Sequence, residues 1–371
     1  MNEPVKIAFI TNLCPTYRVK AFQGLAKRYD VDFYFYCRPE DSRVSHLEIV
    51  SDAERFHYLT TAQILMRLFT QNYPVVIKCS NGKYITLLSF LTAKLMRKKF
   101  IFWHSMWYTP QTLFRRFSMP VLKWIFKYSD AVVVYGEHGK KYLESHGVEP
   151  RKIFIAWQSV DNELFAKAVP AKALSTIRGA RAAAGKKVVL FVGRFVEEKG
   201  VSYLIEAVAQ LKDDGLCLML VGEGPLKEAL EKQCVENRLD CFVFVGKVPN
   251  SELYKYYALA DVFVLPSITT REFKEPWGLV VNEAMNQGTP VVVTDAVGAG
   301  VGGLVQEGVN GFVVPERDSQ SLSVALRKII SDDALRAAMG QNAKRVIKDW
   351  TYERMVEGFT DAIAYAQGAK K

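Results

Sequence analysis

Hydrophobic residues in the first 157 positions gather in short runs of β-branched and aromatic side chains, separated by longer segments with helical spacing. These runs are nearly continuous rather than alternating with polar residues, which is typical of strands buried on both faces of a parallel sheet. The alternation of strands and helices therefore predicts an α/β domain with helices on both sides of its sheet. The expected strands are VKIAFIT (5–11), VDFYFYC (31–37), PVVIKCS (74–80), KFIFWH (99–104), DAVVVY (130–135) and KIFIAW (152–157).

The same pattern starts again after a segment that is poor in β-forming residues. This segment, 162–187, contains Pro170, Gly179 and Gly185, which are typical of a boundary. A helix over 200–212 carries apolar residues at the i, i+3, i+4 and i+7 positions and is expected to pack on the second sheet. The strands expected in the second half are KVVLFVG (187–193), LCLMLVG (216–222), CFVFVG (241–246), DVFVLPS (261–267), TPVVVTD (289–295) and GFVVP (311–315).

Two doubly wound, Rossmann-like α/β domains follow from this repetition. Because open α/β sheets bind ligands at the carboxyl ends of their strands, we expect the two domains to face a central cleft. The predicted divisions are 1–165 for the first domain, 166–186 for a linker, 187–349 for the second domain, and 350–371 for a C-terminal helix that crosses back to the first.

The net charge of +10 is concentrated in the first half of the chain. Residues 1–165 hold 23 Lys and Arg against 14 Asp and Glu, whereas residues 166–371 hold 26 against 25. A basic half can face phosphate, nucleic acid or an anionic membrane. No helix-turn-helix, zinc-finger or RNA-binding signature accompanies it, so we expect no nucleic-acid partner.

Hydropathy and cysteine usage predict a cytoplasmic protein. The sequence has no run of about 18 apolar residues, so no transmembrane helix is expected. The opening segment MNEPVKIAFITNL has only four consecutive apolar residues, which suits a strand rather than a signal peptide. The cysteines show no CxxC pair and no metal-ligand spacing, and we expect free thiols in a reducing compartment. They are Cys14, Cys37, Cys79, Cys217, Cys234 and Cys241.

A basic and aromatic stretch over 94–128 is a candidate for peripheral attachment to the inner face of a membrane. A helix with one apolar stripe turned inward would direct its basic side chains outward, as helices on anionic membrane surfaces do. The alternative is a core-facing helix with a solvated basic face, and Pro120 interrupts both patterns. The residues expected to face inward are Leu113, Phe117, Val121, Trp124 and Tyr128.

The loop GRFVEEKG (193–200) opens the second domain's first helix and carries two cations, Arg194 and Lys199. Both cations and the helix N-terminus can converge on one diphosphate, where they would stabilise charge that develops on a leaving group. The alternative is a solvated loop in which Arg194 pairs with Glu197 or Glu198.

Two carboxylates, Glu275 and Glu283, lie in the segment EPWGLVVNE, directly after a predicted strand and around the start of a helix. A helix N-terminus offers free N–H groups and a positive dipole end, which suits a phosphate. Carboxylates before and inside this helix could hold hydroxyls at both ends of a nucleotide sugar. The next glycine loop, GEGP (222–225), is not a dinucleotide fingerprint, because Lys227 occupies the third glycine position.

These blocks together resemble a known family. GRFVEEKG, VGEGP, VGKVPNSEL, DVFVLPS, EPWGLVVNEAMNQGTPVVVTD and EGVNGFVVP occur in that order over 193–315 and resemble the C-terminal domain of the retaining family 4 glycosyltransferases, which have the GT-B fold. The first half is similar more loosely, through FIFWHS and AVVVYGEHGKKYLESHGVEPRKIFIAWQSVDNELF.

The resemblance implies roles for individual residues. Arg194 and Lys199 would bind the diphosphate of a nucleotide-sugar donor, Glu275 would contact the transferred sugar, and Glu283 would hold the ribose. His104 matches the family's active-site histidine, although a histidine between tryptophans is more often a packed core residue. Further donor contacts are expected from Gly193, Gly222, Gly224, Gly246, Lys247, Val248, Trp277, Gly278 and Leu279.

The sequence departs from the family at the first loop, TNLCPTYR (11–18), which has no glycine. We expect Pro15, Tyr17 and Arg18 to shape the acceptor pocket there instead. The pair Asp30 and Asp32 matches a metal-binding DxD pattern of another glycosyltransferase fold, but it opens a strand at the edge opposite the expected ligand side. No metal and no cofactor are therefore expected.

The sequence-based hypothesis is a retaining, metal-independent hexosyltransferase that moves a sugar to a saccharide or lipid-linked acceptor, in the assembly of envelope polysaccharide. No well-placed carboxylate nucleophile is visible, which favours front-face substitution. The alternatives are a nucleotide-sugar epimerase or a phosphorylase on the same fold, and a non-catalytic protein that docks to membranes through its basic half.

Overall fold

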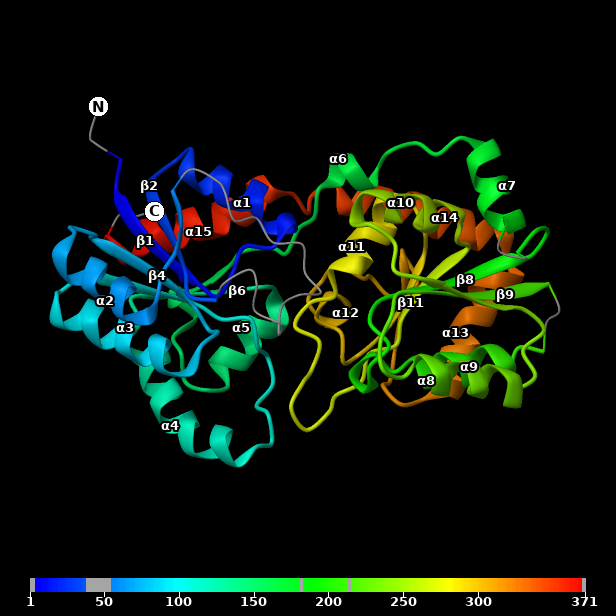
Figure 1. The fold of residues 1–371 in the computed structure, drawn as a ribbon, viewed down its shortest axis with the longest axis horizontal. Helices are drawn as coiled ribbons and strands as arrows, with labels where there is room; N and C mark the ends of the chain where they lie inside the picture. Colours follow the sequence, from blue (N-terminus) through cyan, green and yellow to red (C-terminus); the bar gives the residue numbers. More distant parts are fainter. Residues whose placement is uncertain (1–3, 38–54, 181–182, 213–214, 369–371) are drawn as a thin grey trace. The chain divides into compact units, whose positions relative to one another are not determined.

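The computed structural model describes residues 4–37, 55–180, 183–212 and 215–368 (Figure 1). The chain forms two compact units. Unit 1 comprises residues 1–158 and 352–371, and unit 2 comprises residues 159–351. This division lies seven residues before the predicted one at 165, and the C-terminal segment belongs to unit 1.

Unit 1 is built on a parallel sheet with the strand order β3-β2-β1-β4-β5-β6-β7. The six strands predicted in this half are present, because each contains a mostly apolar run that can be buried on both faces. The seventh, β3, is only three residues long and was not predicted. The strands are β1 (Lys6–Thr11), β2 (Asp30–Phe35), β3 (Phe56–Tyr58), β4 (Val75–Cys79), β5 (Lys99–Trp103), β6 (Ala131–Val134) and β7 (Ile153–Ile155).

Helices cover both faces of this sheet, and successive strand residues point to opposite sides. Ile7 and Phe9 of β1 pack with α1 (Thr16–Ala26) and α15 (Tyr352–Ala366). Ala8 and Ile10 point to the other face, where they pack against a second set of helices (Figure 1). These are α2 (Thr61–Thr70), α3 (Lys83–Leu95), α4 (Leu113–Tyr128) and α5 (Glu137–Glu144), and a 3₁₀ turn, η2 (Pro150–Lys152), precedes β7.

The predicted inward face of α4 is wrong. All five residues expected in the core are exposed, from 40% for Val121 to 77% for Phe117. The helix is apolar on two sides, so the sequence pattern alone did not decide which side faces the sheet. The buried side consists of Met119, Leu122, Ile125 and Phe126.

Unit 2 contains a second parallel sheet, with the order β10-β9-β8-β11-β12-β13. All six strands predicted for this half are present. They are β8 (Lys187–Val192), β9 (Leu216–Val221), β10 (Phe242–Gly246), β11 (Val262–Leu265), β12 (Val291–Thr294) and β13 (Gly311–Val314).

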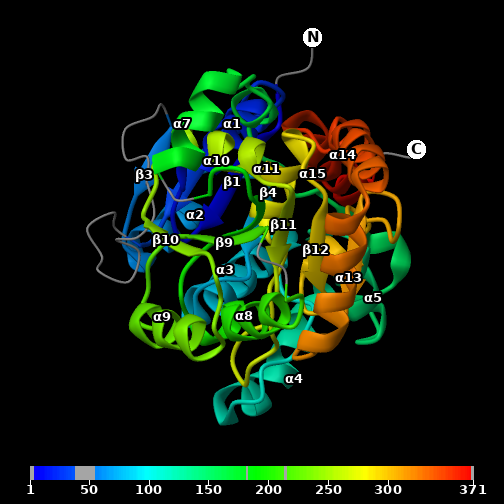
Figure 2. The same cartoon turned by 90° about the vertical axis from the view of Figure 1, so that its right-hand side faces the viewer.

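The helices of unit 2 form a layer on each side of its sheet (Figures 1 and 2). One layer contains α8 (Val201–Ala209), α9 (Lys227–Glu236) and α13 (Ser319–Ser331). The other contains α10 (Leu253–Leu259), α11 (Leu279–Asn286) and α14 (Asp333–Ile347). The remaining short elements are α6 (Asn162–Phe165), α7 (Ala171–Ala180), α12 (Gly298–Val301), η3 (Glu197–Lys199) and η4 (Asn250–Glu252). No helix in the described ranges is long and apolar enough to cross a membrane.

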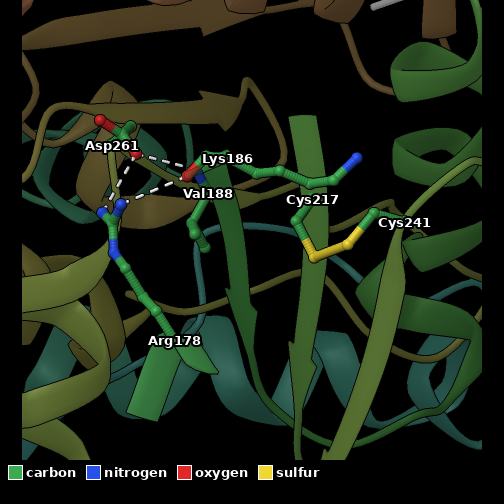
Figure 3. Close-up of a disulfide and its surroundings, with 6 residues drawn as sticks. All are labelled: Arg178, Lys186, Val188, Cys217, Cys241 and Asp261. Carbon is green, nitrogen blue, oxygen red and sulfur yellow. Dashed lines mark hydrogen bonds and ion pairs between the residues drawn. A yellow bond between two sulfur atoms is a disulfide. The ribbon is translucent and has the colours of Figure 1, made fainter. Parts of the chain in front are cut away.

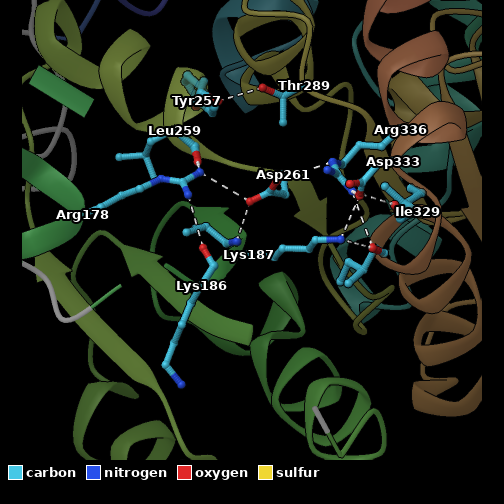
Figure 4. Close-up of polar contacts among 12 residues, drawn as sticks. Arg178, Lys186, Lys187, Tyr257, Leu259, Asp261, Thr289, Ile329, Asp333 and Arg336 are labelled. Carbon is cyan, nitrogen blue, oxygen red and sulfur yellow. Dashed lines mark hydrogen bonds and ion pairs between the residues drawn. The ribbon is translucent and has the colours of Figure 1, made fainter. Parts of the chain in front are cut away.

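Asp261, directly before β11, attaches α7 and α14 to the unit 2 sheet (Figure 4). Its carboxylate accepts a hydrogen bond from the Val188 N–H at 2.8 Å. It also pairs with Arg178 of α7 and with Arg336 of α14, each at 3.4 Å. The region predicted as a linker, 166–186, is instead part of unit 2, and its helix α7 is attached to the sheet through Arg178.

Cys217 and Cys241 are joined in a disulfide, which corrects the expectation of free thiols for this pair (Figure 3). Cys217 lies on β9 and Cys241 directly precedes β10. The register pairs Leu218 with Phe242, so the preceding residues of the two parallel strands are neighbours. Their separation of 24 residues in the sequence does not by itself predict the disulfide, which depends on this register. The free cysteines are Cys14, Cys37, Cys79 and Cys234.

The C-terminal helix α15 approaches the sheet of unit 1 closely at Gly358. A Cβ added there would lie 2.2 Å from the backbone oxygen of Ile155 in β7. Nearby, the ring of Phe359 packs against Trp103 of β5 at 5.3 Å between centroids. A side chain at 358 would thus push the whole helix away from the sheet.

We predict that Gly358→Ala lowers the free energy of unfolding of unit 1 by about 1–3 kcal/mol, the usual cost of overpacking. Urea unfolding followed by tryptophan fluorescence measures the change. Gly179→Ala on α7 is the matched control, because its added Cβ would have nothing within 4 Å. That variant should be neutral or more stable by up to about 1 kcal/mol, since alanine favours helix. Equal effects of the two substitutions would contradict this account of the packing.

Candidate functional site

The carboxyl ends of four neighbouring strands in unit 2 carry most of the predicted site residues. In a parallel sheet these ends share one edge, so loops far apart in sequence meet there. The order β10-β9-β8-β11 places the four loops side by side. The loops bring Gly246–Val248 after β10, Gly222 and Gly224 after β9, Gly193–Lys199 after β8, and Glu275–Leu279 after β11.

Lys199 and Glu275 form an ion pair between the loops that follow β8 and β11. The ammonium Nζ of Lys199 donates to Oε2 of Glu275, and the hydroxyl of Ser267 donates to the same oxygen at 3.3 Å. The Lys199 and Glu275 side chains are only 16% and 10% exposed. A buried charge needs such a partner, so each residue fixes the position of the other.

Gly200 allows these two loops to approach each other. It has a φ of 62° and caps the N-terminus of α8. A Cβ at this position would lie 2.1 Å from the backbone oxygen of Pro266, at the end of the β11 segment. The Ile268 N–H also donates to the backbone oxygen of Glu198 at 2.9 Å. The close backbone contact therefore brings Lys199 within reach of Glu275.

Arg194 is held much more loosely than Lys199. Its guanidinium lies 3.4 Å from Glu198 and its side chain is 51% exposed. This pairing of Arg194 with Glu198 is the one expected in the alternative in which the loop is solvated. Exposed ion pairs of this kind contribute only about 0–1 kcal/mol, so Arg194 can turn to an anionic ligand at little cost.

The segment EPWG is fixed in front of α11 by several backbone contacts. Gly278 has a φ of 91°, in the left-handed region, and starts the helix. The Gly298 N–H donates to the backbone oxygen of Glu275 at 3.1 Å, and the Ala299 N–H donates to the backbone oxygen of Trp277 at 2.7 Å. The Trp277 indole also donates to Asn282 at 2.8 Å. The first N–H groups of a helix lack partners within it, so this end can accept an anion.

Glu283 lies within α11 and is 8% exposed. Burial raises the pKa of its carboxyl to about 7, and a hydrogen bond from the Tyr257 hydroxyl, 2.7 Å long, partly opposes that shift. Tyr257 is fully buried, and its backbone oxygen accepts from the Thr289 hydroxyl at 2.7 Å. Tyr257 therefore positions Glu283, a role that nothing in the sequence indicated.

The glycine loops after β8 and β9 pack directly against each other. A Cβ on Gly222, whose φ is 137°, would lie 1.9 Å from the oxygen of Gly193. One on Gly224 would lie 2.4 Å from the oxygen of Phe195. Packing alone thus requires glycine at 222 and 224. Gly246 differs, because a Cβ there would have nothing within 4 Å.

His104 directly follows β5 in unit 1 and is packed in its core. The side chain is 1% exposed, and its ring lies among Phe102, Phe126 and Tyr142 at 4.9–6.0 Å between centroids. Neither ring nitrogen has a hydrogen-bond partner within the described part of the chain. Burial, with smaller contributions from Arg115 and His146, lowers its pKa to about 3. The ring is therefore uncharged at neutral pH, and its catalytic role stays a prediction.

Pro15, Tyr17 and Arg18 line one hollow of about 120 Å³ in unit 1. Arg18 is 8% exposed and donates to Gln158 at 2.6 Å and to the Tyr135 hydroxyl at 3.3 Å. Its guanidinium also lies 4.9 Å from the centre of the Trp103 ring. The hollow thus combines an arginine with aromatic walls, a composition that suits a sugar or a phosphate. Other lining residues that the sequence did not indicate are Asn12, Asn81 and Tyr135.

Asp30 and Asp32 are engaged in contacts at the amino end of β2. Asp30 pairs with Arg55, and Asp32 accepts from the Tyr73 hydroxyl at 2.5 Å. Across the described ranges, no group of three or more His, Cys, Asp or Glu side chains gathers in a way that could hold a metal ion.

Two family models match the chain, one in each half. Residues 20–164 match Glycosyltransferase Family 4, and residues 176–346 match Glycosyl transferases group 1. An uncharacterised glycosyltransferase of Methanocaldococcus jannaschii is 36% identical over 43% of this chain and 40% of its own length. The α-D-kanosaminyltransferase of Streptomyces kanamyceticus is 28% identical over 63% and 61%. The chain thus spans about half the length of these relatives.

Solved structures share the fold of the whole chain. HepE of Anabaena, crystallised with UDP, is 18% identical with a TM-score of 0.76 and covers 97% of this chain and 99% of its own. A glycosyltransferase of Rickettsia africae is 16% identical with a TM-score of 0.76, and the match covers both chains fully. The two parallel-sheet units and these matches show a GT-B fold. Together with the family models they support a glycosyltransferase similar to group 1 and family 4.

We predict that Glu283→Gln changes how stability depends on pH. The native pKa of about 7 lies above the ordinary value of 4.5, so the folded protein binds the proton more tightly across this range. The wild-type free energy of unfolding should therefore fall as the pH rises from about 4.5 to above 7, by up to about 3 kcal/mol more than that of the variant. Urea unfolding between about pH 5 and pH 8 measures it.

Glu236→Gln, at a carboxylate that is 61% exposed in unit 2, is the matched control and should follow the wild type. Identical pH profiles for wild type and Glu283→Gln would contradict the raised pKa.

Proposed function

We propose that this chain, a glycosyltransferase similar to group 1 and family 4, transfers a sugar from a nucleoside diphosphate sugar to an acceptor hydroxyl and retains the anomeric configuration. The single observation that carries the proposal is the buried Lys199–Glu275 pair beside the N-terminus of α11. This pair supports the proposal because a held cation, a helix N-terminus and a carboxylate lie at one sheet edge. A sugar diphosphate presents complementary groups, because its diphosphate is anionic and its sugar carries hydroxyls.

Lys199, Arg194 and the amides that start α11 would bind the diphosphate. These groups neutralise the charge that develops on the leaving phosphate as its bond to the sugar breaks. Lys199 is held in place before the donor arrives, whereas Arg194 exchanges Glu198 for the donor. Since these cations and the helix end supply the positive charge, the proposed reaction needs neither a metal ion nor an organic cofactor.

Glu283 and Glu275 would hold hydroxyl groups of the donor. An ionised carboxylate accepts hydrogen bonds only, so it can take both hydroxyls of a ribose. Glu283 accepts one hydrogen bond, from Tyr257, which leaves acceptor capacity for the ribose. Glu275 accepts hydrogen bonds from Lys199 and Ser267, and its carboxylate is proposed to contact the transferred sugar when the donor binds.

The engagement of Glu275 with Lys199 also bears on the mechanism. A carboxylate paired with an ammonium group is a weak nucleophile, which argues against a covalent sugar intermediate on this residue. We therefore propose front-face substitution. The bond from the anomeric carbon to the phosphate oxygen breaks, the acceptor oxygen bonds to the same face, and its proton moves to the departing phosphate.

The proposed acceptor is a saccharide or a lipid-linked saccharide in envelope polysaccharide assembly. Similar proteins include glycosyltransferases named for the biosynthesis of colanic acid, of amylovoran and of the lipopolysaccharide core. The hollow at Arg18 is the proposed acceptor contact. We propose that the enzyme is cytoplasmic and attaches peripherally to an anionic membrane. The comparisons do not favour the epimerase, phosphorylase or non-catalytic alternatives.

We predict that Arg194→Ala and Lys199→Ala each lower turnover by about 10²-fold or more, since each removes positive charge that meets the leaving diphosphate. Sugar transfer and donor hydrolysis are measured with UDP, GDP and ADP sugars, and circular dichroism verifies folding. Lys232→Ala, at a lysine that is 76% exposed on α9, should stay within twofold of wild type. Because Arg194 is half-exposed, its loss should leave the fold intact. Folded Arg194→Ala with wild-type turnover would therefore refute the assignment.

A further inference from the structure

We propose that one face of unit 1 docks on a bilayer that contains anionic lipids. This surface, called the α2–α4 face, consists of the outward side chains of α2, α3 and α4, and its apolar residues would enter the lipid headgroup region. The inference deepens the membrane part of the proposed function. It does not depend on the transfer reaction, so the two can fail separately.

Exposed apolar side chains are concentrated on this face. Among the described residues, 15 large hydrophobic side chains are exposed, and 13 of them lie between positions 66 and 128. Such a concentration of exposed apolar side chains on three helices of one unit is uncommon on a monomeric protein and marks an interaction site. The 13 are Met66, Phe69, Tyr84, Leu88, Leu91, Leu95, Met96, Leu113, Phe114, Phe117, Val121, Trp124 and Tyr128.

Helix α4 contributes six of these residues, although it already buries a separate apolar side against the sheet. Leu113 and Phe117, one turn apart, are 68% and 77% exposed. Packing within unit 1 therefore does not explain the outward apolar side. A 16-residue helix with aromatic and leucine side chains among basic residues has the composition of helices that lie in a membrane interface.

The charge of this region is complementary to an anionic surface. Residues 55–129 contain 12 Lys and Arg and not one Asp or Glu. The first acid after this stretch, Asp130, is occupied by Lys94 at 2.7 Å and by Lys99 at 3.5 Å. Arg116 and Lys123 of α4 are exposed beside the apolar residues. Basic residues near anionic lipids add to the attraction from buried apolar area.

A groove between α3 and α4 continues the apolar surface inward. It has a volume of about 250 Å³, and Tyr84, Leu87, Phe114 and Val121 are among its lining residues. Phe90 of α3 packs edge-to-face on Trp124 of α4 at 4.9 Å, which holds the two helices together at one end. The size and lining of the groove suit a segment of a lipid chain.

Charge argues for a membrane over a second copy of this chain. If two copies joined through the α2–α4 face, both surfaces would bring lysines and arginines and neither would bring an acid from residues 55–129. Like charges opposed at an interface are unfavourable. An anionic bilayer has the opposite charge together with an apolar layer beneath it.

Flotation with lipid vesicles tests the inference. The vesicles are phosphatidylcholine alone or an equimolar mixture with phosphatidylglycerol, at low salt (about 50 mM) and at about 0.5 M, where exposed charges are screened. We expect wild type to partition more strongly to the anionic vesicles than to phosphatidylcholine alone, and to retain measurable partitioning through its apolar residues at about 0.5 M salt. Leu113→Ser with Phe117→Ser should lower the partition coefficient at least about tenfold at both salt concentrations, since apolar burial is lost. Arg116→Glu with Lys123→Glu should lower it about as much, at low salt alone.

The matched controls are Val235→Ser, at a valine that is 65% exposed on α9, and Lys348→Glu, at an exposed lysine that follows α14. Both should float like wild type. Thermal shifts with UDP, GDP and ADP measure donor binding separately. The face variants should keep whichever shift the wild type shows, and Arg194→Ala should still float. Wild type that stays in solution with anionic vesicles would overturn the inference. A second result would also overturn it: wild type is a dimer, and Leu113→Ser with Phe117→Ser makes it a monomer without changing its flotation. The α2–α4 face would then be a protein interface.

Discussion

The ion pair between Lys199 and Glu275 is the interaction on which the site depends. It joins the loops that follow β8 and β11, two neighbouring parallel strands, and both charges are largely removed from water. Breaking such a pair would leave a largely shielded charge without its partner, which is unfavourable. The close backbone contact at Gly200 and the fixed EPWG segment bring these two side chains together. The N-terminus of α11 is thereby held beside a permanent cation.

The two cations of this edge differ in a way that suits catalysis. Lys199 is buried and paired before any ligand binds, so no reorganisation is needed when charge develops near it. Arg194 is exposed and loosely paired, so it can move to a ligand and away again after reaction. Glu283 is placed by a tyrosine in the core, which extends the same rigidity to the ribose end of the proposed donor.

Sequence patterns predicted the sheets well, because nearly every long strand is a mostly apolar run. They failed where a pattern is ambiguous or depends on register. Helix α4 is apolar on two sides, so its buried side was assigned wrongly, and the Cys217–Cys241 bond follows only from the pairing of β9 with β10. The loop residues around Lys199 and Glu275 could be predicted, since short motifs follow each strand. The support from Tyr257 could not, because nothing local distinguishes that residue from other tyrosines in the core.

The most direct test of the central claim is a crystal structure of the chain with a nucleoside diphosphate bound. The diphosphate should lie within hydrogen-bonding distance of Lys199, of Arg194 released from Glu198, and of the first amides of α11. The ribose hydroxyls should contact Glu283. A diphosphate bound away from the carboxyl ends of β8 and β11, with the Lys199–Glu275 pair undisturbed and without ligand contacts, would contradict the account.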